Sequence, residues 1–349
     1  MSNRLFLIQL KGPVHGSSIS GEAIKKYVVT ENDYMVPINL AQNGKDMGHF
    51  RLKKLFLLAG QILSVIRLSK KVDKCILFYT SSGILFYRDL LFRFILRKKS
   101  MTLVMHNKGA RNSRVPVSLK QYFFSNVHII VLAKELVSDF DIFSVNSTIS
   151  VIPNPLFERV TPPEVKDYSK LRFLYLSNLI RSKGVLESIE LVKCLISLGM
   201  DVSLDIVGSE VDVTGKEIEE MVGIHTDQIK YWGPQYGPAK VKFMQESNIF
   251  LFLSSYPREC SPLSIIEAMA YSMPVIALNN GGVKSLIHNK ENGVLINSLS
   301  NHKDIQDLAM DILRISAAEW NAMGRKSFER YKEDHQLENW KNKMLDALK

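Results

Sequence analysis

Cysteine is scarce in this chain of 349 residues, which contains only Cys75, Cys194 and Cys260. Three cysteines, odd in number and far apart, exclude a disulfide framework and a cysteine-based zinc site and fit a reducing compartment. The sequence also lacks internal repeats and low-complexity segments. With 46% hydrophobic and 23% charged residues it has the composition of a globular protein. At about 150 residues per domain, its length indicates two domains, each large enough to bury its own core.

Long apolar runs are missing as well. A membrane-spanning helix needs about 18 apolar residues, whereas the longest candidate, residues 55–66, is shorter and contains Gly60 and Gln61. The first apolar run, residues 5–10, is cut off by Lys11. We therefore expect no secretory signal and no transmembrane helix, and a protein that is soluble or peripheral to a membrane.

Acidic residues are rare between positions 51 and 120, where 16 Lys/Arg stand against two Asp. This segment carries +14, so the rest of the +10 chain is slightly acidic at −4. Residues 51–58 and 87–99 mix cations with large apolar side chains, a pattern typical of basic amphipathic helices on anionic membranes. The residues expected to contact the membrane are Arg88, Arg93, Arg97, Lys98 and Lys99.

Two other interpretations of this charge exist. The segments could be core helices whose exposed faces are basic. Nucleic acid is a weaker candidate, because no zinc-finger spacing, RNA-binding aromatic signature or helix-turn-helix pattern accompanies the charge.

Hydrophobic patterning predicts two α/β domains. In the first half, short β-rich runs alternate with helical patterns, which indicates a doubly wound domain with a mostly parallel sheet. We expect strands over 5–10, 34–40, 74–79, 102–106, 127–132 and 150–153, and helices over 18–29, 51–70, 83–97, 117–124 and 133–143. In the second half we expect strands over 171–176, 202–207, 228–232, 249–253, 274–278 and 294–296, and helices over 184–198, 239–246 and 263–271, with the last 45 or so residues helical.

The expected domains are 1–158 and 159–330, with 331–349 a C-terminal helix that packs back on the first domain. Strand C-termini of both domains would face a cleft, a favourable place for a small-molecule site.

Two carboxylates follow the predicted strand 249–253. Glu259 falls in the loop before a helix, and Glu267 lies eight residues further along, on that helix. Ser261 and Pro262 form a favourable N-cap and N1 pair for its start. One carboxylate can approach a reacting sugar and the other a ribose, while the helix N-terminus offers amides to phosphates.

This segment, which runs on through Glu-Ala-Met-Ala, Pro-Val-Ile-Ala and Gly281-Gly282, resembles the retaining nucleotide-sugar glycosyltransferases of the GT-B fold, family-4 type, or group 1. The resemblance covers nearly the whole chain. It implies two Rossmann-like domains that face a central cleft, with Glu259 by the donor sugar and Glu267 on the nucleotide ribose. It also implies donor contacts at the start of the helix and in the glycine loops, namely Ser261, Pro262, Leu263, Gly281, Gly282, Gly208 and Gly16.

The resemblance places a second set of residues around the donor diphosphate and the acceptor. Lys183 with Gly184 matches the family's diphosphate loop, but Asn178 stands at the usual Arg position. Arg181 either replaces that arginine at the diphosphate or is a solvated loop cation. His106 ends a buried strand where family members often carry a histidine that faces the donor sugar. His15, in the first glycine-rich turn, is a candidate acceptor contact.

The sequence differs from the family pattern after Gly281-Gly282, where Lys284-Ser285 replaces the usual Pro-Glu. No Asp-x-Asp metal-binding triplet precedes a predicted strand end, and the histidines have no zinc spacing. We therefore expect no obligatory metal and no cofactor beyond the UDP- or GDP-linked sugar substrate.

The sequence thus predicts a retaining glycosyltransferase that moves a sugar from a nucleotide-diphospho-sugar to a lipid-linked saccharide in surface-polysaccharide assembly, such as O-antigen or capsule. It would act in the cytoplasm, peripheral on the inner face of the plasma membrane. Two alternatives stay open: a nucleotide-sugar 2-epimerase of the same architecture, and a non-catalytic basic membrane-binding protein.

Overall fold

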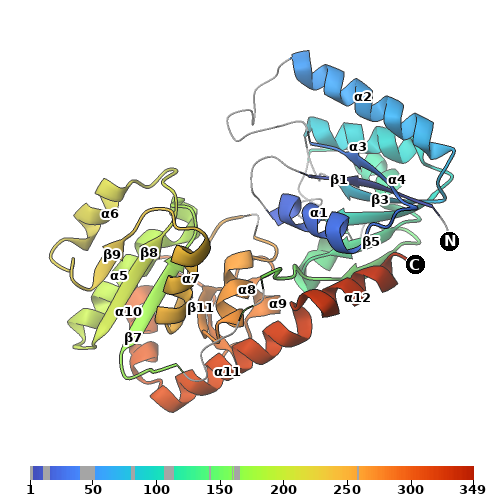
Figure 1. The fold of residues 1–349 in the computed structure, drawn as a ribbon. Coiled ribbons are helices and arrows are strands. Elements are labelled where there is room, and N and C mark those ends of the chain that lie inside the picture. Colours follow the sequence, from blue (N-terminus) through green and yellow to red (C-terminus); the bar gives the residue numbers. More distant parts are fainter. Residues whose placement is uncertain are drawn as a thin grey trace. The chain divides into compact units, whose positions relative to one another are not determined.

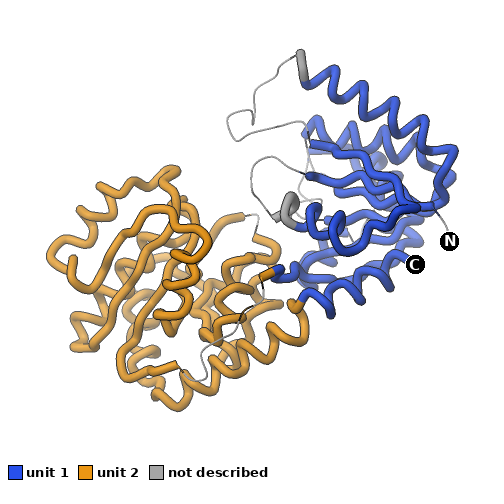
Figure 2. The backbone as a smooth tube through the Cα atoms, viewed as in Figure 1, with its two compact units in different colours: residues 1–157, 337–349 blue, residues 158–336 orange. Residues whose placement is uncertain are grey.

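The computed structural model divides the chain into two compact units, coloured separately in Figure 2. Unit 1 is Met1–Phe157 together with Leu337–Lys349, and unit 2 is Glu158–Gln336. The structure describes residues 3–10, 16–39, 52–79, 83–105, 114–140, 143–158, 160, 166–257 and 259–349, without the side chains of residues 16–19, 52 and 53.

Unit 1 is an α/β unit built on a parallel sheet (Figure 1). Its strands are β1 (Arg4–Ile8), β2 (Tyr34–Pro37), β3 (Lys74–Tyr79), β4 (Ser100–Met105), β5 (His128–Val131) and β6 (Thr148–Val151). Its helices are α1 (Gly16–Tyr27), α2 (Leu52–Ser69), α3 (Ile84–Ile95), α4 (Val117–Phe124), the 3₁₀ helix η2 (Lys134–Asp139) and α12 (Leu337–Ala347). The strand order β2-β1-β3-β4-β5-β6 reverses direction between β1 and β3.

The strands of unit 1 form its core. Residues 5–8 of β1 are fully buried, as expected for a parallel strand covered by helices on both faces, which reads in sequence as a continuous apolar run. The first residue of β1, Arg4, donates two hydrogen bonds to the Asp33 carboxylate, at 2.9 and 2.7 Å. This pair holds the start of β1 against the turn before β2.

The predicted helix over 133–143 is wrong, because among its described residues only 134–139 are helical, and they form the short 3₁₀ helix η2. No side chain caps its N-terminus, and the Ser138 hydroxyl donates to the Glu135 carbonyl, 3.2 Å away. A serine hydroxyl that donates to a nearby backbone carbonyl competes with regular α-helical hydrogen bonding.

Unit 2 repeats the architecture (Figure 1). Its strands are β7 (Leu171–Leu176), β8 (Val202–Val207), β9 (Ile229–Tyr231), β10 (Ile249–Phe252), β11 (Val275–Leu278) and β12 (Gly293–Ile296). Its helices are η3 (Arg181–Lys183), α5 (Val185–Ser197), α6 (Gly215–Val222), α7 (Gly237–Glu246), α8 (Leu263–Ala270), α9 (Val283–Leu286), α10 (His302–Leu313) and α11 (Ala317–Asp334). The parallel order β12-β11-β10-β7-β8-β9 confirms the prediction of a second doubly wound α/β unit.

The last helix of the chain, α12, belongs to unit 1, whereas α11 belongs to unit 2. The chain returns to unit 1 at Leu337, after six residues of the segment 331–349. Trp340 of α12 is buried within unit 1, and its ring lies edge-on to Phe157. Within the described ranges, no helix combines the length and the apolar character needed to cross a membrane.

Candidate active site

The strand order of unit 2 changes direction between β7 and β10. The chain runs from β7 through β8 to β9 on one side, and then continues at β10 on the other side of β7. In open parallel sheets, ligands bind outside the carboxyl ends of the strands at such a switch point. The two loops that leave this point are residues 177–184, after β7, and residues 253–262, after β10.

Gly184 allows these two loops to touch. Its φ of +83° is left-handed, and a Cβ at this position would lie 2.3 Å from the Leu253 carbonyl oxygen. The Ser255 amide donates to the Ser182 carbonyl, 2.8 Å away, across the same contact. A glycine is therefore required where the backbone after β7 meets the backbone after β10.

This contact brings Lys183 and Glu259 together, although they are far apart in sequence. The Lys183 ammonium forms an ion pair with the Glu259 carboxylate. Glu259 is buried, and its Oε1 also accepts a hydrogen bond from the Ser254 hydroxyl at 3.0 Å. Lys183 Nζ lies 4.5 Å from the centre of the Tyr256 ring, a cation–π distance. The arrangement fixes one cation and one carboxylate at the switch point.

The loop after β11 contacts the backbone of Glu259. Gly281 has a φ of +58°, and a Cβ there would lie 2.0 Å from the Glu259 carbonyl oxygen. The Gly282 amide donates to that same carbonyl, at 3.3 Å. The Asn280 side chain donates to the carbonyls of Ser254 and Tyr256, at 3.1 and 2.7 Å. The paired glycines thus let this loop pack directly against the backbone that carries Glu259.

Glu267 has a different partner. It lies on α8, and its carboxylate is paired with the Lys240 ammonium of α7, 3.0 Å away. Burial raises the pKa of Glu267, and Lys240 offsets only part of that effect. A half-buried carboxylate next to a lysine is able to accept hydrogen bonds from ligand hydroxyls.

The N-cap of α8 lies one residue later than the sequence suggested, whereas the helix begins at the predicted residue 263. Pro262 occupies the N-cap position of α8 with an extended backbone, and Leu263 is the first helical residue. Ser261 and Pro262 are buried, and Leu263 is partly buried. The first amides of α8 therefore come shortly after Glu259 in the sequence.

Arg181 points away from the Lys183–Glu259 pair. Its guanidinium bonds the Glu217 carboxylate of α6 at 2.7 Å, and its amide donates to Asp212, also at 2.7 Å. Half of its side chain is exposed. The structure therefore does not gather Arg181 and Lys183 around one carboxylate.

Gly208 follows β8, and a Cβ there would lie 1.8 Å from the Ser177 carbonyl oxygen after β7. Gly208 thus lies against the loop that leads to Lys183.

In unit 1, His15 and His106 lie outside the described residues, and of Gly16 only its place at the start of α1 is described. The expected membrane contacts divide into two groups. Arg97 and Lys98 are exposed and Lys99 is partly exposed, whereas Arg88 and Arg93 are buried.

The expectation that Arg88 and Arg93 contact a membrane is therefore wrong. Arg88 forms an ion pair with Asp89 and donates to the Ile38 carbonyl at 2.6 Å, just after β2. Arg93 donates to the Ser125 carbonyl at 3.1 Å, at the end of α4. Both guanidiniums satisfy polar groups inside unit 1.

Several residues of the site were not found from the sequence. Ser254 and Asn280 hold the Glu259 loop, and Lys240 pairs with Glu267. None belongs to a local motif that distinguishes it from an ordinary loop or helix residue. Across the described ranges, no group of three or more His, Cys, Asp or Glu side chains is arranged to hold a metal ion.

Known proteins resemble parts of this chain in sequence. Residues 158–330 match the family model described as Glycosyl transferases group 1. A curated relative from Haemophilus influenzae, described as an uncharacterized glycosyltransferase, is 31% identical over 156 residues. That match covers 44% of this chain and 42% of the relative, so the chain spans less than half of the relative's length.

Solved structures resemble the fold of the whole chain. A glycosyltransferase from Rickettsia africae gives a TM-score of 0.71 at 16% identity, over 99% of this chain and 97% of that one. The Anabaena protein Alr3699/HepE, solved in complex with UDP, gives 0.73 at 15% identity, over 99% of both chains. At these identities the likeness establishes the fold, and the predicted GT-B architecture is confirmed.

The two doubly wound units and the likeness of the whole chain to these solved structures define a GT-B fold. Unit 2 is a glycosyl transferases group 1 domain, which confirms the expected resemblance. The glycosyltransferase activity of the whole chain stays a prediction, since the chain spans only 42% of the curated relative.

Proposed function

We propose that this protein is a retaining glycosyltransferase that moves a sugar from a nucleotide-diphospho-sugar to a lipid-linked saccharide at a membrane surface. The observation that carries the proposal is the Lys183–Glu259 pair at the switch point of a group 1 domain. The Anabaena neighbour was solved with UDP and with UDP-glucose, so UDP-linked donors are the first to test.

The donor would bind at the carboxyl edge of the unit 2 sheet. Lys183 would hold the diphosphate, Glu259 would contact the donor sugar, and Glu267 would accept hydrogen bonds from the ribose hydroxyls. The first amides of α8 and the Gly281-Gly282 loop would lie beside the diphosphate. Arg181 would have to exchange Glu217 for the diphosphate in order to replace the missing family arginine.

The reaction proposed is a front-face substitution. The bond between the sugar C1 and the diphosphate oxygen breaks, and a bond from C1 to the acceptor oxygen forms on the same face. The proton of the acceptor hydroxyl passes to the leaving phosphate. Lys183 stabilises the negative charge that develops on that phosphate, which lowers the barrier because the interaction is strongest in the transition state.

Donor binding tests the site directly. The full-length protein is mixed with UDP-glucose, UDP-N-acetylglucosamine and GDP-mannose, and the shift in melting temperature is measured. Lys183→Ala should abolish the shift. Lys326→Ala is the matched control, because Lys326 forms an exposed ion pair with Glu329 at 2.7 Å, and it should leave the shift unchanged. Equal binding by both variants would contradict the role given to Lys183.

Product analysis separates the proposal from its two alternatives. With an α-linked donor and a lipid extract as acceptor, the expected product has an α-linkage, which NMR of the anomeric proton detects. A β-linkage would overturn retention. An isomerised nucleotide sugar formed without acceptor would favour the 2-epimerase, and a failure to bind any nucleotide sugar would favour the non-catalytic membrane protein.

Exposed apolar side chains on unit 1 support the membrane part of the proposal. On α3 these are Ile84, Tyr87, Leu91 and Phe94, whose spacing places them on one face. The neighbouring helix α2 exposes Leu55, Phe56, Leu63 and Ile66. Arg67, Lys70, Arg97 and Lys98 are exposed on or next to these helices. Apolar groups with cations around them fit an anionic bilayer surface.

A vesicle assay tests this surface. The protein should co-sediment with vesicles that contain phosphatidylglycerol but not with pure phosphatidylcholine, and added salt should weaken binding. Phe56→Ser combined with Phe94→Ser should abolish sedimentation. Ile224→Ser is the control, since Ile224 is 91% exposed on unit 2. If neither lipid binds, the membrane part of the proposal falls and the donor site is unaffected.

A further inference from the structure

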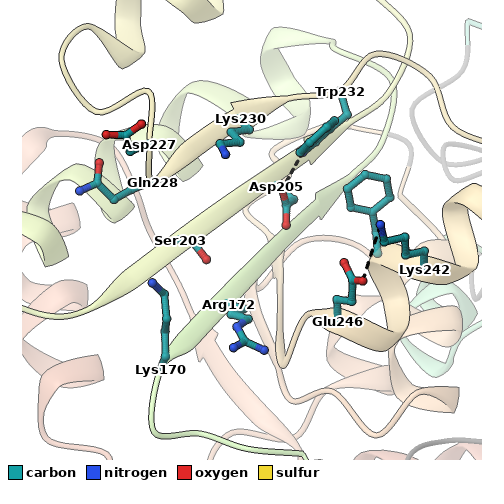
Figure 3. A pocket seen from close by; sticks show the side chains of 11 residues that line it. Lys170, Arg172, Ser203, Asp205, Asp227, Gln228, Lys230, Trp232, Lys242 and Glu246 are labelled. Atoms are coloured by element: carbon teal, nitrogen blue, oxygen red, sulfur yellow. Dashed lines mark hydrogen bonds and ion pairs between the residues drawn. The ribbon is translucent and has the colours of Figure 1, made fainter.

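A polar pocket of about 400 Å³ lies on the sheet of unit 2, away from the Lys183–Glu259 pair. Figure 3 shows Arg172 of β7, Asp205 of β8 and Trp232, just after β9, on this face of the sheet, with Glu246 from the last turn of α7 beside them. Its volume falls within the range of small-molecule sites, about 300–1,000 Å³. At the amino end of β7 the pocket is lined by Lys170 and Arg172, whereas Lys183 follows the carboxyl end of that strand.

The sheet register explains why polar side chains gather here. Asp205 is paired with Lys230 of β9, and Arg172 with Ser203 of β8. Paired residues in neighbouring parallel strands point to the same face, so these four side chains share one surface. α7 covers only part of it.

Trp232 is the most unusual member of the pocket. It is 46% exposed, whereas the two other tryptophans of the chain, Trp320 and Trp340, are 1% and 2% exposed. Its indole is held in place: Nε1–H donates to Asp205 Oδ1 at 2.6 Å, and its ring lies 5.6 Å from that of Phe243. A large aromatic ring that is fixed and yet open to solvent offers a flat surface to a ligand.

The polar groups around this ring include both donors and acceptors. The guanidinium of Arg172 makes no hydrogen bond or ion pair with the described part of the chain, and Glu246 has only a long contact of 3.8 Å to Lys242. The pocket is lined by four cations and three carboxylates, so their charges nearly cancel. A site for a polyanion would be lined by cations alone. Sugar hydroxyls both donate and accept hydrogen bonds, so a site for them needs acceptors and donors alike.

We propose that this pocket binds a neutral, hydroxyl-rich glycan, with a sugar ring stacked on Trp232 and its hydroxyl groups bonded by Arg172, Asp205 and Glu246. The site holds a saccharide without transferring sugar to it. It is independent of the proposed function, because it needs neither donor nor catalysis. The basic excess of the chain lies in residues 51–120, outside unit 2, which does not fit a nucleic-acid surface.

The tryptophans of the chain supply the test. Since only Trp232 is substantially exposed, quenching of tryptophan fluorescence by acrylamide reports mainly on this residue. The probes are maltohexaose, cellohexaose, chitohexaose and mannohexaose, each added at millimolar concentration to the full-length protein. At least one should protect Trp232 and reduce the quenching. Dextran sulfate serves as the polyanionic probe and should not.

Calorimetry with the protecting hexasaccharide then measures affinity. Trp232→Ala should weaken binding at least about tenfold, the scale expected for loss of a central aromatic contact. Tyr236→Ala is the matched control, since Tyr236 is 75% exposed four residues away and does not line the pocket. It should bind as wild type does. Saturating UDP should not displace the glycan.

Four results would overturn the proposal: no protection by any neutral hexasaccharide, protection by dextran sulfate alone, equal affinity in Trp232→Ala, or displacement by UDP. The last would assign the glycan to the donor site. A protein that fails to bind nucleotide sugars but still shows Trp232-dependent glycan binding would refute the proposed function and leave this site standing.

Discussion

Replacing Gly184 with alanine should separate the two loops that carry Lys183 and Glu259. A Cβ at Gly184 would lie 2.3 Å from the Leu253 carbonyl oxygen, and the backbone there has a φ of +83°. The left-handed conformation costs an alanine roughly 1–2 kcal/mol, and relieving an overlap in packed structure costs about another 1–3 kcal/mol. The expected total of about 2–5 kcal/mol is a large share of a typical net stability of about 5–15 kcal/mol.

Gly199 offers a matched control for this variant. It follows the other end of α5 with a φ of +81°, and a Cβ there would meet no atom within 4 Å. Gly199→Ala should therefore cost only the backbone strain of roughly 1–2 kcal/mol. The difference between the two variants isolates the loop contact.

Two measurements check the reasoning. Thermal unfolding should place Gly184→Ala below Gly199→Ala by about 2–4 °C for each kcal/mol of difference, as for a domain of this size. UDP-glucose should stabilise Gly199→Ala normally and Gly184→Ala weakly, because Lys183 no longer lies beside Glu259. Equal melting temperatures, or full stabilisation of Gly184→Ala by the donor, would refute the view that this contact assembles the site.

Three further changes test other parts of unit 2. Gly281→Ala should displace the Glu259 carbonyl and lower transferase activity at least about tenfold, whereas Gly237→Ala, with a similar φ of +53° and open space around it, should not. Burial lowers the pKa of Lys166 to about 8 in the folded protein. Between about pH 8 and 10 the unfolded chain therefore binds more protons than the folded one, so the free energy of unfolding should rise with pH. Urea unfolding should show this slope in wild type and not in Lys166→Met. Burial raises the pKa of Glu267, so the folded protein binds more protons than the unfolded chain as the pH rises from about 4.5. Wild type should therefore lose stability relative to Glu267→Gln over this range. Urea midpoints that change with pH equally in both proteins would contradict this.

Much of the fold could be predicted from the sequence because its strands are buried on both faces. The predicted strands over 74–79 and 249–253 match β3 and β10, since each is an apolar run that is almost wholly buried. Helix α6 was missed. Its signal was Thr214, whose hydroxyl accepts from the Glu217 amide at 3.2 Å, part of the Thr-x-x-Glu pattern that marks a helix start.

The site was only partly predictable. Glu259 and Glu267 could be predicted because both lie within one short stretch of sequence, a loop and the helix that follows it. The Lys183–Glu259 contact could not, because it depends on β7 lying next to β10, which is a property of strand order. Lys240 likewise reaches Glu267 from another helix.

The two buried arginines show a different limit. On an amphipathic pattern, a cation is assigned to the solvent face, and Arg88 and Arg93 were assigned in this way. Arg88 is buried because Asp89 neutralises it and the Ile38 carbonyl needs a donor. The proposed membrane surface therefore consists of exposed cations such as Arg97 and Lys98 and the exposed apolar side chains of α2 and α3.

Both units bring backbones into contact at their switch points, and each does so with a glycine. In unit 1, a Cβ at Gly21 of α1 would lie 1.8 Å from the Gln9 carbonyl oxygen, just after β1. In unit 2, Gly184 meets Leu253, just after β10. β1 and β10 each border the place where strand order reverses. The glycine in each unit therefore sets how closely a helical segment approaches the end of a strand at the switch point, and a side chain at either position would have to push the two backbones apart.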